Sequence, residues 1–280
     1  MKDKEVGIAH EPNGIRPLIR WAGSKRRLLP RLASYWEALS PKRYIEPFAG
    51  SGALFFHLRP KVALLNDINA DLIGAYKVLA KSPKRIHELV SHMPSDEESY
   101  YKIRSADIGS MNSVDRAARF IYLNRYCFNG IYRTNRNGDF NVPYGAAKSG
   151  GLPSLEKFIT AAKQLKSAKL YSLDFEEFVD SNVKRGDFVY LDPPYAVANR
   201  RVFRQYDPNT FGIEDLERLA LLLERIDSKG ASFLVSYAYS AEIKSLMTRW
   251  KSNRVMAQRN VAGFTKHRRK AVEVMITNIC

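Results

Sequence analysis

Short apolar runs alternate with amphipathic stretches along the first part of the chain. Residues 44–48 form an apolar run that leads into two glycines, and residues 62–65 form a second run that ends at an acid. Residues 53–58 look like the start of a helix, and residues 71–81 carry apolar side chains at helical spacing. This order of strand, glycine turn, helix, strand, acid and helix is typical of the opening of a doubly wound α/β sheet.

The alternation stops at about residue 82 and resumes near residue 169. The interval carries a helical pattern over residues 114–127, followed by a polar stretch rich in Gly, Asn and Arg. Beyond it we predict strands at 170–173, 187–192, 232–236, 254–260 and 271–276, and helices at 214–226 and 241–250. The economical division is a loose leader at 1–16, an α/β domain built from 17–81 and 169–280, and a helical insertion at 82–168.

A tight turn is predicted inside the insertion at Asn137-Gly138, because this dipeptide tolerates the positive φ angles of a type I′ turn. We therefore expect a β-hairpin over about residues 131–143. Its strands carry polar side chains at Arg133, Asn135 and Arg136. With little apolar surface to bury, the hairpin is either an exposed decoration or a finger for a polar partner. A two-stranded ribbon fits the major groove of DNA, where Arg recognises guanine and Asn recognises adenine.

The charge of the chain changes the weight of these alternatives. Its 280 residues contain 45 Lys plus Arg against 29 Asp plus Glu, which gives a formal net charge of +16. With 45% hydrophobic residues the chain is typical of a globular protein and not of a disordered polycation. The excess is either a solvated basic surface or a match for a phosphate-rich partner, since Lys and Arg displace counterions from nucleic acid.

Several classes of protein are excluded by what the sequence lacks. No apolar run approaches the roughly 18 residues of a membrane helix, and the first residues lack the apolar centre of a secretion signal. The two cysteines, Cys127 and Cys280, are too few for a disulfide framework. The five histidines form no ligand pair at helical spacing, so we expect no metal site and a cytoplasmic protein.

Two glycines follow the first predicted strand. Gly50 and Gly52 let the backbone turn tightly and approach a ligand. The third glycine of a dinucleotide fingerprint is replaced by Phe55, so a ligand without a pyrophosphate is the better match. Asp67 ends the second strand, where a carboxylate can accept hydrogen bonds from ribose hydroxyls. It could equally cap the helix that follows.

The sharpest chemical signal is Asp192-Pro193-Pro194-Tyr195, which follows an apolar strand. It therefore lies at the carboxyl edge of the sheet, where such folds bind ligands. The two prolines fix φ and remove both N–H donors, which leaves a carboxylate, carbonyl oxygens and an aromatic face. This combination can accept hydrogen bonds from an amino group while stacking on a flat ring. It can also be no more than a strand-ending turn.

Five motifs, in this order, resemble those of Dam-type (class alpha, N6-adenine) DNA methyltransferases. They are residues 20–25 (RWAGSK), 46–52 (EPFAGSG), 66–69 (NDIN), 129–133 (NGIYR) with 138–145 (GDFNVPYG), and 192–195 (DPPY). The resemblance covers about residues 17–278. It implies a Rossmann-like S-adenosyl-methionine-dependent sheet with an inserted target-recognition domain, S-adenosyl-methionine as methyl donor and double-stranded DNA as partner. It further implies a prokaryotic or phage enzyme of the nucleoid, monomeric or homodimeric, with no obligate protein partner.

The resemblance also implies a role for individual residues. The cofactor site would be formed by Trp21, Lys25, Phe48, Gly50, Gly52, Asp67, Asp174, Phe175 and Asp192. Catalysis would fall to Asp192, Pro193, Pro194 and Tyr195, and DNA binding to Arg20, Ile131, Arg133, Asn135, Arg136 and Pro143. For Trp21 and Phe175, packing in the core is the alternative. The chain has Ala146-Ala147 where GATC-specific members carry Arg and an aromatic residue, so the recognised site stays open.

The expected mechanism follows from the target. The amino nitrogen of adenine is a poor nucleophile because its lone pair is delocalised into the ring. We expect Asp192 and the Pro193 carbonyl to accept its two N–H bonds while Tyr195 stacks on the base, which must first leave the helix. Two alternatives are a catalytically silent relative that only occupies DNA and a methyltransferase of protein glutamine or RNA. The undamaged motifs argue against the former, and the basic hairpin favours duplex DNA over the latter.

Overall fold

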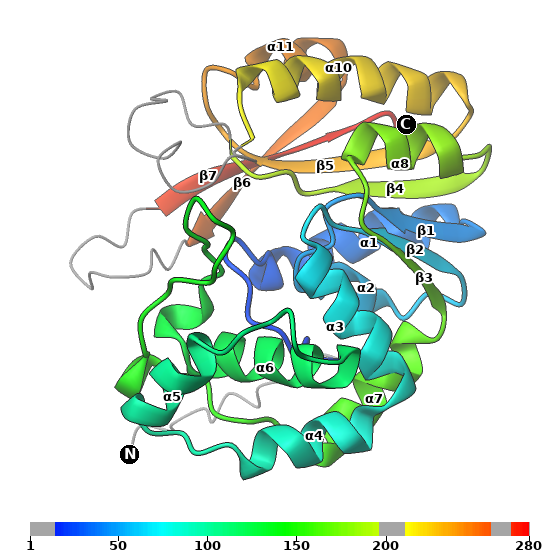
Figure 1. Cartoon of the computed structure of the whole chain (residues 1–280). Helices are drawn as coiled ribbons and strands as arrows, with labels where there is room; N and C mark the ends of the chain where they lie inside the picture. The colour runs from blue at the N-terminus through cyan, green and yellow to red at the C-terminus, as the bar shows by residue number, and fades with distance from the viewer. Residues whose placement is uncertain (1–14, 196–210, 259–269, 280) are drawn as a thin grey trace, which may run out of the picture.

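The computed structural model describes residues 15–195, 211–258 and 270–279 and is built around a seven-stranded sheet. The strands lie in the order β3-β2-β1-β4-β5-β7-β6 (Figure 1). Five of them are parallel: β3 (Ala168–Tyr171), β2 (Ala63–Asn66), β1 (Arg43–Glu46), β4 (Asp187–Leu191) and β5 (Ser232–Ala238). Two long strands, β7 (Lys270–Thr277) and β6 (Lys251–Gln258), complete the sheet in antiparallel pairing. The predicted α/β sheet is confirmed.

Helices cover both faces of the sheet, as Figure 1 shows. One face packs against α1 (Leu29–Leu39), α2 (Ala53–Leu58) and α3 (Ala70–Lys81), and η1 (Arg26–Leu28) precedes α1. The other packs against α8 (Phe175–Asn182), α10 (Ile213–Ser228) and α11 (Lys244–Arg249). Successive strand residues alternate between the two cores, as the pleat requires. Tyr44 and Phe188 lie in the first core, whereas Ile45 and Val189 lie in the second.

The chain between β2 and β3 forms a helical layer beyond α3. It consists of α4 (Pro83–His92), α5 (Glu97–Arg104), α6 (Ser113–Tyr126), η2 (Phe128–Gly130), η3 (Ala146–Lys148) and α7 (Leu155–Leu165). In Figure 1, α4, α5, α6 and α7 lie on the far side of α3 from α10. One hydrophobic cluster is continuous from the sheet through Tyr76 and Leu79 of α3 to Ile86, Ile121 and Phe158. The division of the chain into a catalytic and a recognition domain therefore remains a prediction about function.

The predicted hairpin is correct in position but wrong in its turn. Thr134 and Phe140 form an isolated antiparallel bridge, and the Asn135 N–H donates to the Asp139 carbonyl at 2.9 Å. Gly138 has a φ of +87°, whereas Asn137 is not among the residues with positive φ, so a type I′ turn is excluded. The Asn135 side-chain oxygen accepts the N–H groups of Asn137 and Asp139, both at 2.9 Å. This local side-chain bonding fixes a different turn, with only the glycine in the left-handed region.

Most other predicted elements are present with shifted ends. The helix predicted to begin at residue 241 begins at Lys244, and the strand predicted from residue 254 begins at Lys251. The predicted leader lies outside the described residues up to residue 14, and at its end the Ile15 N–H donates to the Phe56 carbonyl at 3.1 Å. Among the described helices, each is too short or too polar to cross a bilayer.

Candidate active site

The functional motifs meet at the edge of the sheet where the parallel strands end. The glycine turn follows β1, Asp67 follows β2 and Asp192 follows β4. Because β1 pairs in parallel with both β2 and β4, the three segments leave the sheet side by side. This edge is where open α/β sheets bind ligands.

The glycine turn is held by contacts on both sides. Gly50 and Gly52 have φ angles of +47° and +63°, which only glycine adopts without strain. The Asp67 carboxylate accepts the Gly50 N–H at 2.8 Å, and the Tyr76 hydroxyl donates to the Gly50 carbonyl at 2.9 Å. A Cβ on Gly50 would lie 2.7 Å from Cδ1 of Trp21, so the indole lies directly on the turn.

Asp67 bonds to the glycine turn, and Asn69 caps the following helix. The second carboxylate oxygen of Asp67 accepts the Asn69 N–H at 3.0 Å, while the Asn69 side chain accepts the Leu72 N–H at the start of α3. The helix-cap alternative for Asp67 is therefore wrong. Burial raises the pKa of Asp67, and the N–H bonds from Asn69 and Gly50 oppose that rise.

A buried carboxyl group, that of Glu46, lies at the end of β1, and the motifs assign it no individual role. Glu46 is 2% exposed, and its Oε2 atom has no hydrogen-bond partner among the described residues. Burial raises the pKa of Glu46 well above its ordinary value. The nearby Tyr44 hydroxyl opposes that rise, whereas Asp192 and Asp67 add to it. An unsatisfied buried acceptor beside the glycine turn suits a ligand that brings a cation or a donor.

The Asp192 carboxylate is held through one of its two oxygens. Lys25 Nζ lies 2.8 Å from Oδ1, and the Ser236 hydroxyl donates to the same atom at 2.9 Å. Ser236 in turn shares a hydrogen bond of 2.9 Å with the hydroxyl of buried Tyr190. Among the described residues, no hydrogen bond or ion pair to Oδ2 is found. The described residues thus leave Oδ2 as the available acceptor of this carboxylate.

Tyr195 completes the cluster at the end of the tetrapeptide. Its ring packs edge-on against Tyr237 with centroids 5.3 Å apart, and Lys25 Nζ donates to its hydroxyl at 2.9 Å. The hydroxyl donates to Oε1 of Glu273 at 3.2 Å. Pro193 is buried and Pro194 is exposed, so the tetrapeptide runs from the sheet edge outward. Lys25, predicted for the cofactor site, lies in this cluster.

The charges of the cluster influence one another strongly. Burial raises the pKa of Asp192, an effect that the charge and hydrogen bond of Lys25 partly offset. Burial by itself lowers the pKa of Lys25, but Asp192, Tyr195 and Glu273 outweigh it and hold that pKa above its ordinary value. Burial likewise raises the pKa of Tyr195, so at neutral pH its hydroxyl remains a donor.

Comparison with known proteins decides the family. Residues 21–261 match the model of the D12 class N6 adenine-specific DNA methyltransferases. The chain belongs to this family. It is 36% identical over 276 residues to the type II methyltransferase M1.LlaDCHI of Lactococcus lactis subsp. cremoris, covering 94% of this chain and 95% of that protein. It is 35% identical over 249 residues to M.MjaIII of Methanocaldococcus jannaschii, covering 81% and 86%.

A further relative bears the name of the predicted family. The DNA adenine methylase of Escherichia coli K12 is 31% identical over 269 residues, covering 93% of this chain and 94% of that protein. The predicted resemblance is therefore confirmed, and with it site-specific N6 methylation of adenine in DNA as the activity of the class. The alternative of a protein-glutamine or RNA methyltransferase is set aside.

In this methyltransferase, the predicted Asp174-Phe175 pair lies beyond β3, next to the glycine turn. Asp174 begins α8 by accepting the Glu176 N–H at 2.9 Å, and Arg218 Nη2 lies 2.6 Å from the same Oδ1 atom. Phe175 packs against Phe48 with centroids 5.2 Å apart, beneath the Arg218 guanidinium. Phe175 is buried in this aromatic group, while Phe48 and Asp174 are half-buried.

The residues predicted to bind DNA belong to two segments, one at Arg20 and one at residues 131–143, and Arg20 packs against the chain that leads into the second. The Asn124 side chain of α6 bonds both the N–H and the carbonyl of Arg20, at 2.8 and 2.7 Å. Gly130 lies against Arg20 so closely that a Cβ there would be 2.4 Å from the arginine side chain. Arg133 donates to the Asn141 side chain at 2.6 Å.

The remaining predicted DNA contacts differ in exposure. Arg136 and Pro143 are exposed and Ile131 is half-buried. The Asn135 amide is used within the turn, because its Nδ2 donates to Asp139 at 3.0 Å. The structure thus assigns Asn135 a role in shaping the loop, which the sequence did not reveal.

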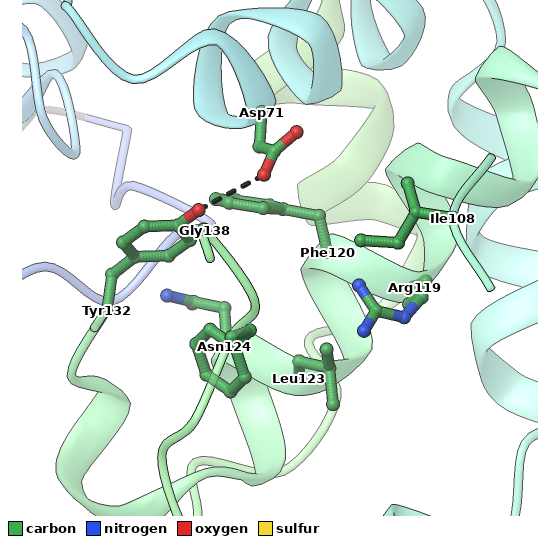
Figure 2. Close-up of a pocket in the computed structure, with 9 residues that line it drawn as sticks. Asp71, Ile108, Arg119, Phe120, Leu123, Asn124, Tyr132 and Gly138 are labelled. Atoms are coloured by element: carbon green, nitrogen blue, oxygen red, sulfur yellow. Dashed lines mark hydrogen bonds between the residues drawn. The ribbon is translucent and has the colours of Figure 1, made fainter. Parts of the chain in front are cut away.

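A small pocket links the hairpin to α3 (Figure 2). Tyr132 of the hairpin segment donates to the Asp71 carboxylate at 3.1 Å, and its ring stacks on Trp21 at 5.6 Å. Arg119 of α6 lines the opposite wall and donates to the Ile103 and Arg104 carbonyls. No motif or periodicity of the chain indicates this pocket. Its lining residue Tyr132 connects the hairpin segment to the indole that lies on the glycine turn.

Proposed function

We propose that this chain transfers a methyl group from S-adenosyl-methionine to the N6 amino group of an adenine flipped out of a short duplex DNA site. The observation that carries the proposal is the Asp192 carboxylate at the sheet edge, held by Lys25 and Ser236 through Oδ1 with Oδ2 left as acceptor. This acceptor lies in the strand-end segment beside the glycine turn, so that an amino group and a methyl donor can meet.

The residues around the glycine turn fit the cofactor. The missing Cβ of Gly50 lets the Trp21 indole lie directly on the turn, and Glu46 offers an unsatisfied buried acceptor for an ammonium group. We assign the adenosine end to Asp67, Phe48, Phe175 and Asp174, with Trp21, Lys25 and Gly52 completing the wall. When bound, S-adenosyl-methionine supplies a methyl group carried on a positively charged sulfur.

The chain's own residues activate and orient the target. Asp192 Oδ2 and the Pro193 carbonyl accept the two N–H bonds of the amino group, which localises the nitrogen lone pair away from the ring. Pro194 stiffens the tetrapeptide, and the Tyr195 face stacks on the base. Extrusion of the base from the duplex costs a few kcal/mol, which its contacts with Asp192, Pro193 and Tyr195 offset. Holding nitrogen and methyl group in line then supplies much of the rate by proximity.

Residues 82–168 form the target-recognition region of this proposal. Arg133 reads guanine, Ile131 is an apolar wedge at the displaced base, and Arg20 contacts DNA beside them. Arg136 and Pro143 are exposed on the same segment, and Asn135 acts through the shape of the turn. The enzyme would act on DNA in the cytoplasm as a monomer or homodimer. A monomer suffices even for a palindromic site, because it can methylate the two strands one after the other.

The deciding experiment profiles methylated adenines in the DNA of a host that has no N6-methyladenine of its own. Expression of the chain should produce N6-methyladenine at one short motif, and Asp192→Ala should abolish it while the variant still folds. Labelled methyl transfer onto purified DNA, RNA and protein should give signal on DNA alone. Unmethylated host DNA, or retained turnover by folded Asp192→Ala, would refute the proposal.

A further inference from the structure

One arginine of α10 contacts the segment assigned to the adenosine end of the cofactor. The helices α8 and α10 lie next to each other on one face of the sheet (Figure 1). Nη2 of Arg218, in the second turn of α10, lies 2.6 Å from Oδ1 of Asp174, the residue that caps α8. The guanidinium carbon lies 4.6 Å from the centroid of the Phe175 ring. A residue outside the five motifs therefore contacts both members of the Asp174-Phe175 pair.

The guanidinium is held in place by three different carboxylates. Besides the contact with Asp174, Nε donates to Oε2 of Glu176 at 2.8 Å and Nη1 donates to Oδ1 of Asp215 at 3.0 Å. The fork of arginine is planar and rigid, so contacts with several acceptors fix its orientation. Asp215 also accepts the Gly212 N–H at the start of α10, at 2.9 Å. Arg218 thus joins the first turns of two helices at one point.

The carboxylate of Asp174 is held in the same way as that of Asp192, through a single oxygen. Oδ1 of Asp174 accepts Nη2 of Arg218 at 2.6 Å and the Glu176 N–H at 2.9 Å. Within the described part of the chain, no hydrogen bond or ion pair to Oδ2 is found, and the side chain is 40% exposed. Oδ2 is therefore left for a ligand that donates a hydrogen bond. The proposed cofactor carries such a donor, the 6-amino group of its adenine.

We propose that Arg218 is a positioning residue for cofactor recognition, which orients the Asp174 carboxylate to accept the 6-amino group of the cofactor adenine and supports the Phe175 ring beside it. This inference rests on the proposed function and deepens it. In a purely structural role, Arg218 would only tie α8 to α10. The two roles differ in one measurable respect, because only the first makes selectivity for the amino group depend on Arg218.

Two ligands that differ at position 6 of the base test the proposal. S-adenosyl-homocysteine, the product of the proposed reaction, carries the amino group, and S-inosyl-homocysteine has a carbonyl oxygen there, which cannot donate. The unaltered chain should bind S-adenosyl-homocysteine about tenfold to a hundredfold more tightly, because the analogue leaves the carboxylate without a donor. In Arg218→Gln this ratio should fall below about threefold, mainly through weaker binding of S-adenosyl-homocysteine. Isothermal titration calorimetry with both ligands measures the ratio.

Arg225 provides the matched control on the same helix. It pairs with Glu176 and Asp180 of α8 and so also ties the two helices together, but among the contacts of the described residues it has none with Asp174 or Phe175. Arg225→Gln should lower the thermal unfolding midpoint as much as Arg218→Gln does and keep the selectivity of the unaltered chain.

A second variant separates charge from geometry. Arg218→Lys keeps the positive charge but lacks the planar fork that contacts three carboxylates at once. It should therefore lose most of the selectivity, and as the milder change it tests the inference even if Arg218→Gln does not fold. In methyl-transfer assays it should raise the KM for S-adenosyl-methionine several-fold, with a smaller change in kcat, because the adenine lies at the far end of the cofactor from the methyl group.

The outcomes that would overturn the inference are distinct from failure of the proposed function. Equal losses of affinity for both ligands in the Arg218 variants would leave only the structural role. The same fall in selectivity in Arg225→Gln, or no selectivity in the unaltered chain, would also overturn the inference. Absence of methyl transfer onto DNA by the unaltered chain would instead refute the proposed function, and the binding ratios are measured without that transfer.

Discussion

At Gly50 the backbone conformation and the close packing of a neighbouring side chain are both demanding. Its φ is +47°, and an added Cβ would lie 2.7 Å from the Trp21 indole. Gly138 provides a contrast within the same chain, because its φ is +87° and an added Cβ would meet nothing within 4 Å. The two positions therefore separate the cost of the left-handed backbone from the cost of the clash.

We expect Gly50→Ala to be destabilised by more than Gly138→Ala, for which strain alone costs about 1 kcal/mol. Gly50→Ala should also bind S-adenosyl-methionine at least about tenfold more weakly, because the indole or the turn must shift. Urea unfolding and equilibrium dialysis on both variants measure the two effects. Equal stability losses, or unchanged cofactor affinity in Gly50→Ala, would show that the turn is not held as described.

Glu46 makes the stability of the chain depend on pH. Its pKa is raised by burial in the folded state, so the folded chain holds this proton at pH values where the unfolded chain has lost it. The contribution of the protonated carboxyl is complete below its ordinary pKa of 4.5 and is lost as pH rises toward the raised value. Glu46→Gln has no proton to lose and should gain stability relative to the unaltered chain as pH rises. Urea unfolding of both proteins between about pH 4 and 8 checks this sign, and parallel pH curves would contradict it.

At the scale of elements, the hairpin segment and the glycine turn are connected through stacked rings. Tyr132 stacks on Trp21 and donates to Asp71 in the first turn of α3. Tyr132→Phe removes the hydrogen bond and keeps the stack, and it should cost about 1 kcal/mol of stability with little change in cofactor affinity.

Tyr132→Ala removes both contacts, and the Trp21 ring loses its support. We expect about 2 kcal/mol of lost stability and a several-fold weaker cofactor affinity. Urea unfolding and equilibrium dialysis of the unaltered chain, Tyr132→Phe and Tyr132→Ala would measure the two effects. Asp71→Asn serves as the control, because it weakens the same hydrogen bond from the other side and should match Tyr132→Phe. A cofactor affinity in Tyr132→Ala equal to that of Tyr132→Phe would disprove the link.

The sequence predicted elements best where the signal is local. Apolar runs gave the parallel strands, and the glycines and Asp67 gave the turns at their ends. The type I′ turn was wrong because the Asn135 side chain, two residues before Asn137, determines the turn. The place of Glu273 in the tetrapeptide cluster was missed because it depends on contacts with Tyr195, 78 residues away, and with Lys25. Its one signal was a charged residue within an alternating apolar strand.

At the scale of the whole molecule, the order of the strands in the sheet could not be predicted from the sequence. β7 lies between β5 and β6 and runs antiparallel to both, and this insertion brings Glu273 to the site. Nor did the composition show that one hydrophobic cluster joins the sheet to α4, α6 and α7. Under the proposed function, this packing of residues 82–168 against the sheet holds Arg133 at a fixed position relative to Asp192.

The net charge of +16 also acts at this scale. If the chain neutralises six or more phosphates, its affinity for duplex DNA should fall about a thousandfold or more between roughly 50 and 200 mM salt. Arg133→Gln should relax the sequence preference and leave the salt slope nearly unchanged if Arg133 reads a base, whereas loss of a phosphate contact would reduce the slope by about one. Fluorescence anisotropy with cognate and scrambled duplexes at four salt concentrations measures both. A flat salt response would mean that the basic residues only keep the surface solvated. If Arg133→Gln keeps the steep salt slope but binds the cognate and the scrambled duplex alike, Arg133 is the residue that reads the sequence.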